Sequence, residues 1–271
     1  EKSVIAVDTE TSSLNPMEAD LVGISLCYDA NQAYYIPIGH KEKTELKKNL
    51  VLKKLKSILE DTSIKKVGQN IKYDLIIFKN ENIELSPIDD TMLLSYTLDA
   101  GNNRHNMDTL SELHLGHKSI SYKEIVGTGK KQLNFSEVDL KSATEYAAED
   151  ADITLRLYEL LSERVSKEKL EKIYEVFEKP MIKILAKLET SGIKVDDVYL
   201  KKLSKKFEEK LIKIEKEIYK ITGKEFNIGS PKQLGEIIYN KLKIAKLKKT
   251  KKGSLATSAK ILEDLAMTGH K

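Results

Sequence analysis

Short apolar runs and longer amphipathic segments alternate along the first part of the chain. Runs rich in β-branched and aromatic residues predict strands at 3–7, 21–28 and 33–38 and a briefer one at 65–67. Short connections join the first three strands, which predicts an antiparallel meander. The spacing of apolar residues elsewhere predicts helices at 45–60, 70–80, 90–98 and 107–115. A further helix is expected after Ser136, whose hydroxyl suits an N-cap.

The pattern changes near residue 165. From 167 to 191 and again from 195 to 222, apolar residues recur with helical spacing, without strand signals of comparable strength. Gly192 and Gly223 stand where these two helices should end. We therefore expect an α/β domain at 1–165 and an all-helical domain at 166–271.

Composition places the chain among ordered, helix-rich globular proteins. Of its 271 residues, 40% are hydrophobic and 32% are charged. No apolar run approaches the roughly 20 residues that a membrane-spanning helix needs, so we expect no membrane partner. Cys27 is the single cysteine, which excludes an intramolecular disulfide and fits a reducing compartment.

The net charge of +4 conceals an uneven distribution. Residues 1–165 contain 20 Lys and Arg against 27 Asp and Glu, whereas residues 166–271 carry 26 basic and 15 acidic residues. The first part is therefore acidic, with a net charge of −7, and the second is basic, at +11. Such an asymmetry favours a polyanion such as nucleic acid as partner, although lysine-rich helix faces are often only solvated surface.

Three separated groups of carboxylates stand out. Asp8 and Glu10 are two apart on a predicted strand and therefore project to the same side. Asp74 follows Asn70 by four residues at the start of a predicted helix. Asp150 follows Tyr146 by four residues, so both share one helix face.

Carboxylates that converge repel one another and are costly to desolvate, and divalent cations would neutralise them. Hard oxygen ligands without Cys or His favour magnesium or manganese. Two such ions about 4 Å apart can activate a water and stabilise both oxygens of a phosphodiester displacement. Each motif also has a simpler interpretation, as a solvated turn, a helix cap or a surface pair. The spacing does not choose these carboxylates over four others, which are Asp89, Asp90, Glu149 and Asp152.

The order of these motifs resembles that of a known nuclease superfamily. Asp8-Thr9-Glu10, Asn70-x-x-x-Asp74 and Tyr146-x-x-x-Asp150 are similar to the three motifs of the DEDD 3′–5′ exonucleases, Tyr subgroup. The surrounding segments VDTETSSL, VGQNIKYD, DDTMLLSYTL, RHNMDTLSE and YAAEDADIT resemble the proofreading domain of family-A DNA polymerases of the bacterial polymerase I type. FEKPMIKILAKLETSGIKVD and FNIGSPKQL resemble the opening of the polymerase domain and its thumb. The resemblance covers nearly the whole chain.

This resemblance implies a fold and a catalytic set. The fold is a ribonuclease-H-like exonuclease domain, with a mixed sheet flanked by helices, followed by a partial helical thumb. The implied reaction is two-metal hydrolysis at DNA 3′ ends, most simply with Mg²⁺, with Mn²⁺ or Zn²⁺ left open. Asp8 is expected to bridge both metals, Glu10 and Asp150 to complete the tighter site, and Asp74 to hold the second metal. Tyr146, together with Glu10, is expected to position the attacking water.

The resemblance also implies contacts with DNA. Leu14 matches an apolar wedge between the last bases, and Arg104 matches a phosphate contact. Tyr122 falls where the family often has Phe, and either ring offers a face for base stacking. The residues expected to line the groove for the 3′ end are Gln69, Asn70 and Tyr73. The lysines expected at the duplex backbone are Lys248, Lys249, Lys251 and Lys252, in a stretch that could equally be a solvated loop.

The chain is expected to be a fragment of a longer polymerase, because the palm and fingers motifs of the family are absent from it. It should then degrade DNA without synthesising it, as a monomer in the bacterial cytoplasm, with an organellar compartment left open. Two alternatives stay open at this point. One is an RNA-trimming exonuclease of the same superfamily, and the other is a non-catalytic DNA-binding module.

Overall fold

The computed structural model describes residues 3–42, 44–244, 253 and 255–269. The chain divides into two compact units, Glu1–Gly192 and Ile193–Lys271. The segment 166–192, which follows the domain boundary expected from the sequence, packs within the first unit.

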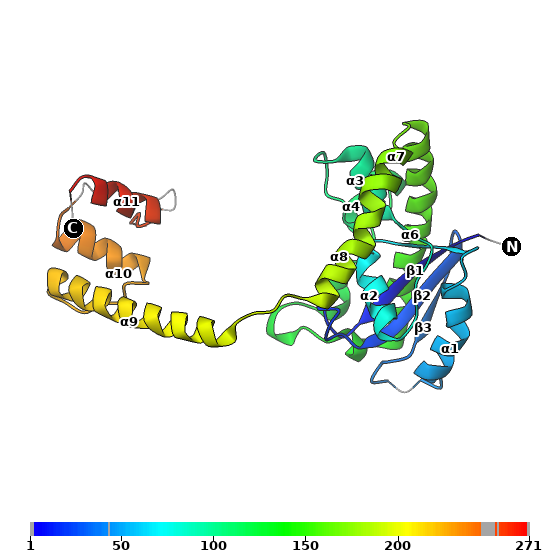
Figure 1. Cartoon of the computed structure of the whole chain (residues 1–271), viewed down its shortest axis with the longest axis horizontal. Helices are drawn as coiled ribbons and strands as arrows, with labels where there is room; N and C mark the ends of the chain where they lie inside the picture. Colours follow the sequence, from blue (N-terminus) through cyan, green and yellow to red (C-terminus); the bar gives the residue numbers. More distant parts are fainter. Residues whose placement is uncertain (1–2, 43, 245–252, 254, 270–271) are drawn as a thin grey trace. The chain divides into compact units, whose positions relative to one another are not determined.

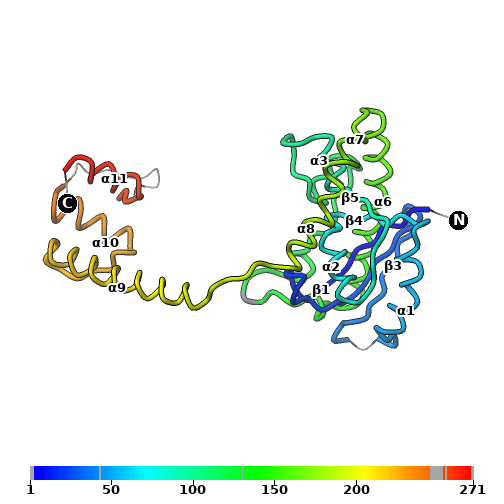
Figure 2. The backbone as a smooth tube through the Cα atoms, viewed as in Figure 1, coloured from blue at the N-terminus to red at the C-terminus, as the bar shows by residue number. Residues whose placement is uncertain are grey.

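One mixed sheet forms the centre of the first unit (Figures 1 and 2). The five strands found in the described residues are β1 (Val4–Thr11), β2 (Leu21–Asp29), β3 (Gln32–Pro37), β4 (Lys65–Gly68) and β5 (Ile88–Asp90). Their order is β3-β2-β1-β4-β5, with the first three antiparallel and β4 and β5 parallel to their neighbours. The predicted meander and mixed sheet are confirmed. The sequence did not predict β5, because two of its three residues are aspartates.

Helices cover the two faces of this sheet. The helices and helical turns described in the first unit are α1 (Lys48–Leu59), α2 (Lys72–Asn80), α3 (Thr91–Asp99), α4 (Met107–Leu110), η1 (Ser111–Leu115), α5 (Tyr122–Val126), η2 (Gly129–Lys131), η3 (Phe135–Glu137), α6 (Leu140–Lys167), α7 (Glu171–Ile173), η4 (Tyr174–Glu178) and α8 (Lys179–Ser191). The alternation of β1 places Ile5 and Val7 in one core cluster, with residues of α1, α2 and α8. Ala6 lies in a separate cluster with residues of α6.

Helix α6 lies close against the sheet because its inner face is built from small residues. Ala143, Ala147 and Ala151 follow one another at four-residue intervals and are fully buried. The helix begins at Leu140 with Asp139 as its N-cap, whose side chain accepts a hydrogen bond from the Ser142 backbone. The prediction that Ser136 caps this helix was therefore wrong, since Ser136 belongs to the preceding turn η3.

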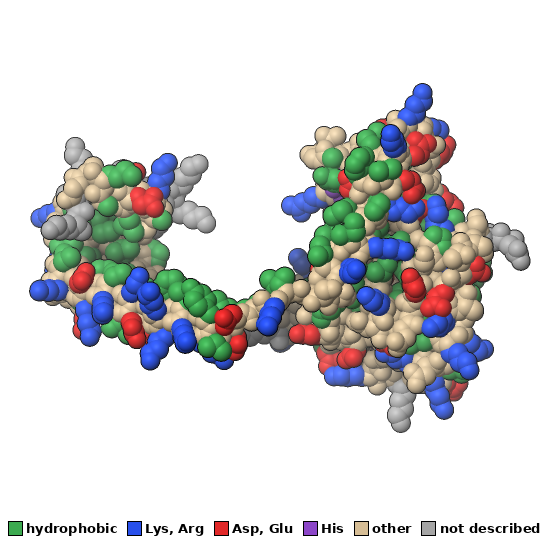
Figure 3. All heavy atoms as spheres, in the orientation of Figure 1, with side chains coloured by type: hydrophobic (Ala, Val, Ile, Leu, Met, Phe, Trp, Pro, Cys, Tyr) green, Lys and Arg blue, Asp and Glu red, His purple; other side chains and the backbone are tan. Residues whose placement is uncertain are grey.

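The second unit is helical over its described residues. Its helices are α9 (Asp197–Thr222), α10 (Pro231–Gly235), η5 (Glu236–Lys241) and α11 (Ala259–Met267). Helix α9 ends at Gly223, which adopts the left-handed conformation expected after a helix. Lysine and apolar side chains both reach the surface along α9 (Figure 3). The Tyr219 hydroxyl donates to the Phe226 carbonyl and so joins α9 to the following loop. The Tyr239 hydroxyl donates to the Ala256 carbonyl and joins η5 to the segment before α11.

Candidate active site

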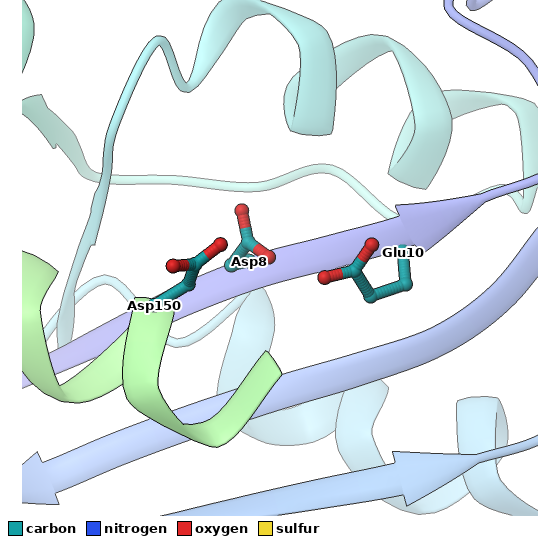
Figure 4. Close-up of side chains that lie close together, drawn as sticks. All are labelled: Asp8, Glu10 and Asp150. Atoms are coloured by element: carbon teal, nitrogen blue, oxygen red, sulfur yellow. The ribbon is translucent and has the colours of Figure 1, made fainter. Parts of the chain in front are cut away.

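Asp8 and Glu10 lie on the face of β1 that looks toward α6. They alternate along the strand with Val7 and Thr9, so the pleat aims both carboxylates the same way. Asp150 reaches the same space from α6 (Figure 4). One carboxylate oxygen from each of the three residues lies within 4.8 Å of the other two. Two neighbouring acids of β1 and a third that is distant in the sequence thus share one small volume.

Asp74 enters from α2, on the opposite face of the sheet, and it is held by the residue between the other two acids. Its Oδ1 accepts a hydrogen bond from the Thr9 backbone N–H at 2.9 Å and from the Thr9 hydroxyl at 2.5 Å. Asp74 is almost fully buried and lies outside the tight group of three. Thr9 therefore orients Asp74 and links it to β1.

These acids strongly disfavour one another's ionisation. Burial raises the pKa of Asp8 to about 6, although the Thr9 N–H acts in the other direction. Burial also raises the pKa of Glu10, and the charges of Asp8, Asp150 and Asp74 raise it further. Burial and the charge of Asp8 raise the pKa values of Asp74 and Asp150 in the same way. A cation of high charge would relieve this repulsion, and the all-oxygen donor set fits a hard divalent ion.

A cavity of about 750 Å³ opens over the acids. The residues predicted for catalysis or DNA contact that line it are Asp8, Glu10, Leu14, Gln69, Asn70, Tyr73, Asp74, Tyr122, Tyr146 and Asp150. Arg104 is exposed and is not among the described residues that line this cavity. Lys248, Lys249, Lys251 and Lys252 lie outside the described residues.

Two of the predicted groove residues already have hydrogen-bond partners in the protein. The Gln69 amide donates to the His105 carbonyl at 2.7 Å and accepts from the Thr91 hydroxyl at 2.5 Å. The Tyr73 hydroxyl donates to the Ser13 carbonyl at 2.5 Å. Their side chains are therefore oriented before any ligand binds. Leu14, in contrast, is 91% exposed at the rim of the cavity.

The structure separates the four competing acids from this site. Asp89 is buried between Lys65 and Lys179, with a nitrogen of each lysine 2.7 Å from its carboxylate. The Asp90 carboxylate accepts hydrogen bonds from the backbone N–H groups of four residues, which are Asn70, Ile71, Met92 and Leu93. Asp90 thus caps α3 and also holds the turn that leads into α2.

The other two competing acids also have structural partners. Glu149 contacts the His117 ring and accepts from the Ile120 backbone N–H. Asp152 accepts from the Asn31 backbone N–H and pairs with Arg156. Neither residue belongs to the tight acidic group found in the described part of the chain.

Sequence reasoning missed the residues that orient the acids. In the sequence Thr9 is only the spacer between Asp8 and Glu10, because its hydrogen bonds to Asp74 span 65 positions of the sequence. The sequence does not distinguish Asp90, which holds two helix starts, from the other acids that could bind a metal. No sequence pattern marks Phe135, yet it is 1% exposed, lies beside the cavity and contacts the ring of Tyr146. A Thr between two acids at a strand end is a signal that could have pointed to Thr9.

Comparison with known families agrees with this geometry. The family model described as 3′-5′ exonuclease matches residues 1–166, which includes all four acids and Tyr146. The chain belongs to this exonuclease family. A second model, DNA polymerase family A, matches residues 197–271. The resemblance found in the sequence is therefore confirmed: the chain combines a 3′–5′ exonuclease domain with the beginning of a family-A polymerase domain.

Curated relatives carry the name DNA polymerase I. The chain is 44% identical to that of Rhizobium leguminosarum, over 98% of this chain and 28% of the relative. It is 39% identical to that of Pseudomonas aeruginosa, over 98% of this chain and 30% of the relative. The chain thus spans less than a third of the length of these relatives.

Solved structures share the fold. The POL domain of Pol1 from M. smegmatis, in complex with DNA primer-template and dNTP, superposes with a TM-score of 0.71 at 24% identity, covering 98% of this chain and 42% of that one. Brucella melitensis NrnC with bound Mg²⁺ gives a TM-score of 0.53 at 24% identity, over 70% of this chain and 85% of NrnC. Among the described residues, no helix is long and apolar enough to cross a membrane.

Proposed function

We propose that this chain removes nucleotides from DNA 3′ ends by metal-dependent phosphodiester hydrolysis, as the proofreading part of a DNA polymerase I. The observation that carries this proposal is the group formed by Asp8, Glu10 and Asp150, whose oxygens approach within 4.8 Å of one another inside a cavity. A merely structural set of acids would be paired with basic residues, as Asp89 is. Instead, the charges of Asp8 and Asp150 raise the pKa of Glu10, and the charge of Asp8 raises the pKa of Asp150, which favours a cation as their partner.

We assign the metal ligands as the family resemblance implies them. Asp8, Glu10 and Asp150 would hold one ion, and Asp8 and Asp74 would hold the second. The all-oxygen set favours Mg²⁺, with Mn²⁺ or Zn²⁺ as the other candidates. Bound ions of this kind supply Lewis-acid activation of a water and of the scissile phosphate.

The protein groups then position the reactants. Burial and the charge of Asp150 raise the pKa of Tyr146, so its hydroxyl stays protonated and can donate a hydrogen bond. Tyr146 and Glu10 would together hold the attacking water in line with the phosphate. Leu14, at the exposed rim, would insert beside the terminal base, and the Tyr122 ring would offer a stacking face.

The remaining expectations belong to the same proposal. The partner would be DNA, with a single-stranded 3′ end at the cavity and a duplex backbone at the lysines of the second unit. Residues 1–165 would form the exonuclease domain and 166–271 the start of the polymerase domain. The match to the exonuclease model ends at residue 166, and the match to the polymerase model begins at residue 197. These limits support a boundary in this part of the chain. A monomer in the bacterial cytoplasm is the expected state.

The test is degradation of end-labelled single-stranded DNA and RNA of the same sequence with Mg²⁺, Mn²⁺ or a chelator. We expect metal-dependent shortening of the DNA from its 3′ end, lost on chelation and reduced by several orders of magnitude in Asp8→Ala. Glu18→Ala removes an exposed acid and serves as the matched control. Trimming of RNA alone would favour the RNA exonuclease instead. Binding of DNA without any cleavage would favour the non-catalytic module.

A further inference from the structure

Three aromatic rings from separate elements meet beside the acidic group. The Phe135 ring lies 6.0 Å from the Tyr146 ring, measured between centroids, and 6.2 Å from the Tyr122 ring. The Phe135 and Tyr122 rings are nearly parallel, at 8°, and the Tyr122 and Tyr146 rings meet edge to face at 6.1 Å. Phe135 is buried, whereas Tyr122 and Tyr146 are partly exposed in the cavity wall. Phe135 therefore supports both tyrosines from behind.

Phe135 is itself held firmly on its other side. Its ring contacts the His40 ring at 5.8 Å, and His40 Nε2 lies 2.7 Å from the Tyr35 hydroxyl. The Tyr35 side chain packs directly over Gly23 of β2. A Cβ atom on residue 23 would lie 2.1 Å from the Tyr35 hydroxyl oxygen, so only glycine leaves room for the ring. Gly23 pairs with Glu10 in the sheet. A continuous set of contacts thus runs from the strand next to the acids, through Tyr35 and His40, to Phe135.

The backbone around Phe135 is also fastened to the site. The Asn134 side chain donates to the Ser12 carbonyl at 2.7 Å, just beyond Glu10 on the chain. Asn134 and Glu137 form a capping box around this short turn, and Glu137 pairs with Lys41. Both the ring and the backbone of Phe135 are therefore placed relative to the acids before substrate binds.

We propose that Phe135 is a positioning residue of the exonuclease site, which holds the rings of Tyr146 and Tyr122 in fixed orientation beside Asp150 and Glu10. This inference rests on the proposed function. Tyr146 is on the same face of α6 as Asp150, but the direction of its ring depends on what packs behind it. Phe135 fills that space, and a smaller side chain would let the Tyr146 hydroxyl move away from the attacking water. Displacements of about 1 Å at a reacting group are enough to slow catalysis markedly.

The first experiment is a double-mutant cycle on single-nucleotide removal from DNA. We expect Phe135→Leu to lower kcat about tenfold in the wild-type background. In a Tyr146→Phe background the same change should lower kcat less than about twofold, because the Tyr146 hydroxyl, which is the positioned group that acts in the chemical step, is already gone. Val138→Ala is the matched control, since Val138 is buried in the same core cluster without belonging to the ring contacts. An unchanged kcat in Phe135→Leu, or an equal loss in both backgrounds, would overturn the proposal.

The second experiment needs no activity. Tyrosine side chains of the whole metal-free chain are ¹³C-labelled, and the Tyr146 and Tyr122 signals are assigned by Tyr146→Phe and Tyr122→Phe. We expect Phe135→Leu to shift both signals and to speed their ring flips, while Tyr158 and Tyr174, in another core cluster, stay unchanged. Unchanged Tyr146 and Tyr122 signals would overturn the proposal. A wild-type chain without nuclease activity would contradict the proposed function, and the ring contact would still be decided by these spectra.

Discussion

The carboxylate of Asp89 and the ammonium of Lys179 lie 2.7 Å apart, although one belongs to the last strand of the sheet and the other begins α8. Asp89 also accepts a hydrogen bond from Tyr174, in the turn just before α8. This contact, together with Lys65 on β4, fastens the segment after α6 onto the exonuclease unit. It gives the aspartate a structural role, in contrast to the acids at the cavity, which have no basic partner among the described residues.

Replacing Lys179 by Met should destabilise the first unit by about 2 kcal/mol, since a buried charged acceptor loses one of its two cations. Chemical denaturation of the whole chain measures this loss. Lys201→Met is the matched control, because Lys201 pairs with an exposed acid on its own helix. Equal stability of the Lys179 and Lys201 variants would contradict the assigned role.

Acid should weaken the same contact. Burial raises the pKa of Asp89, but Lys179 and Lys65 more than offset this and hold it below its ordinary value of 3.8. Because the folded pKa is depressed, the stabilisation is present above pH 4 or so and is lost as the pH falls through the folded pKa. The free energy of unfolding of Asp89→Asn should therefore be well below that of the wild type at pH 6 and should approach the wild-type value near pH 3. Denaturation at each pH measures this difference in unfolding free energy. A difference that stays constant across the range would contradict the pairing of ionised Asp89 with the two lysines.

Divalent ions should stabilise the chain through the four acids at the cavity. Mg²⁺ at about a hundred times its dissociation constant should raise the melting temperature of the first unit by about 5 °C. Asp8→Asn should melt higher than wild type without metal, since it removes one of the repelling charges, and should show little shift with Mg²⁺. Thermal unfolding with Mg²⁺ and with chelator measures both effects. A full Mg²⁺ shift in Asp8→Asn would argue against Asp8 as a ligand, and Glu18→Gln controls for general charge effects.

Thr9 should matter to catalysis through Asp74. Thr9→Val keeps the side-chain shape but removes the hydroxyl that donates to Asp74. We expect about 1 kcal/mol of lost stability and a nuclease rate lowered about tenfold by the misplaced carboxylate. Thr9→Ser retains the hydroxyl and should restore most of the rate. If Ser were as slow as Val, the hydrogen bond would not be the cause.

Leu14 should affect substrate binding without affecting the fold. Its side chain is 91% exposed, so Leu14→Ala should change stability by less than about 0.5 kcal/mol. If it inserts beside the terminal base, KM for single-stranded DNA should rise about tenfold. Steady-state kinetics on DNA measures KM, and Leu113→Ala, another exposed leucine, is the control. An unchanged KM would remove Leu14 from the binding site.

Local sequence was enough to predict elements whose signal is contained in a few residues. The strands β1, β2 and β3 follow from apolar runs with short connections, and the helical second unit follows from its apolar spacing. The pairing of Asp8 with Glu10, and of Tyr146 with Asp150, also needed only the two-residue and four-residue repeats of a strand and a helix. The motif order then identified the family.

Only the tertiary structure decided which acids meet and which are neutralised. Asp8, Asp74 and Asp150 come from three different elements, and without the family resemblance their spacing does not distinguish them from Asp89 or Asp90. Asp89 is paired because the fold carries Lys65 and Lys179 to it, and Asp90 is used because two helix starts meet at its carboxylate. Periodicity determines where a side chain points on its own element. What it meets there depends on long-range packing, and that contact determines whether an acid supports the fold or remains available for the proposed metal ions.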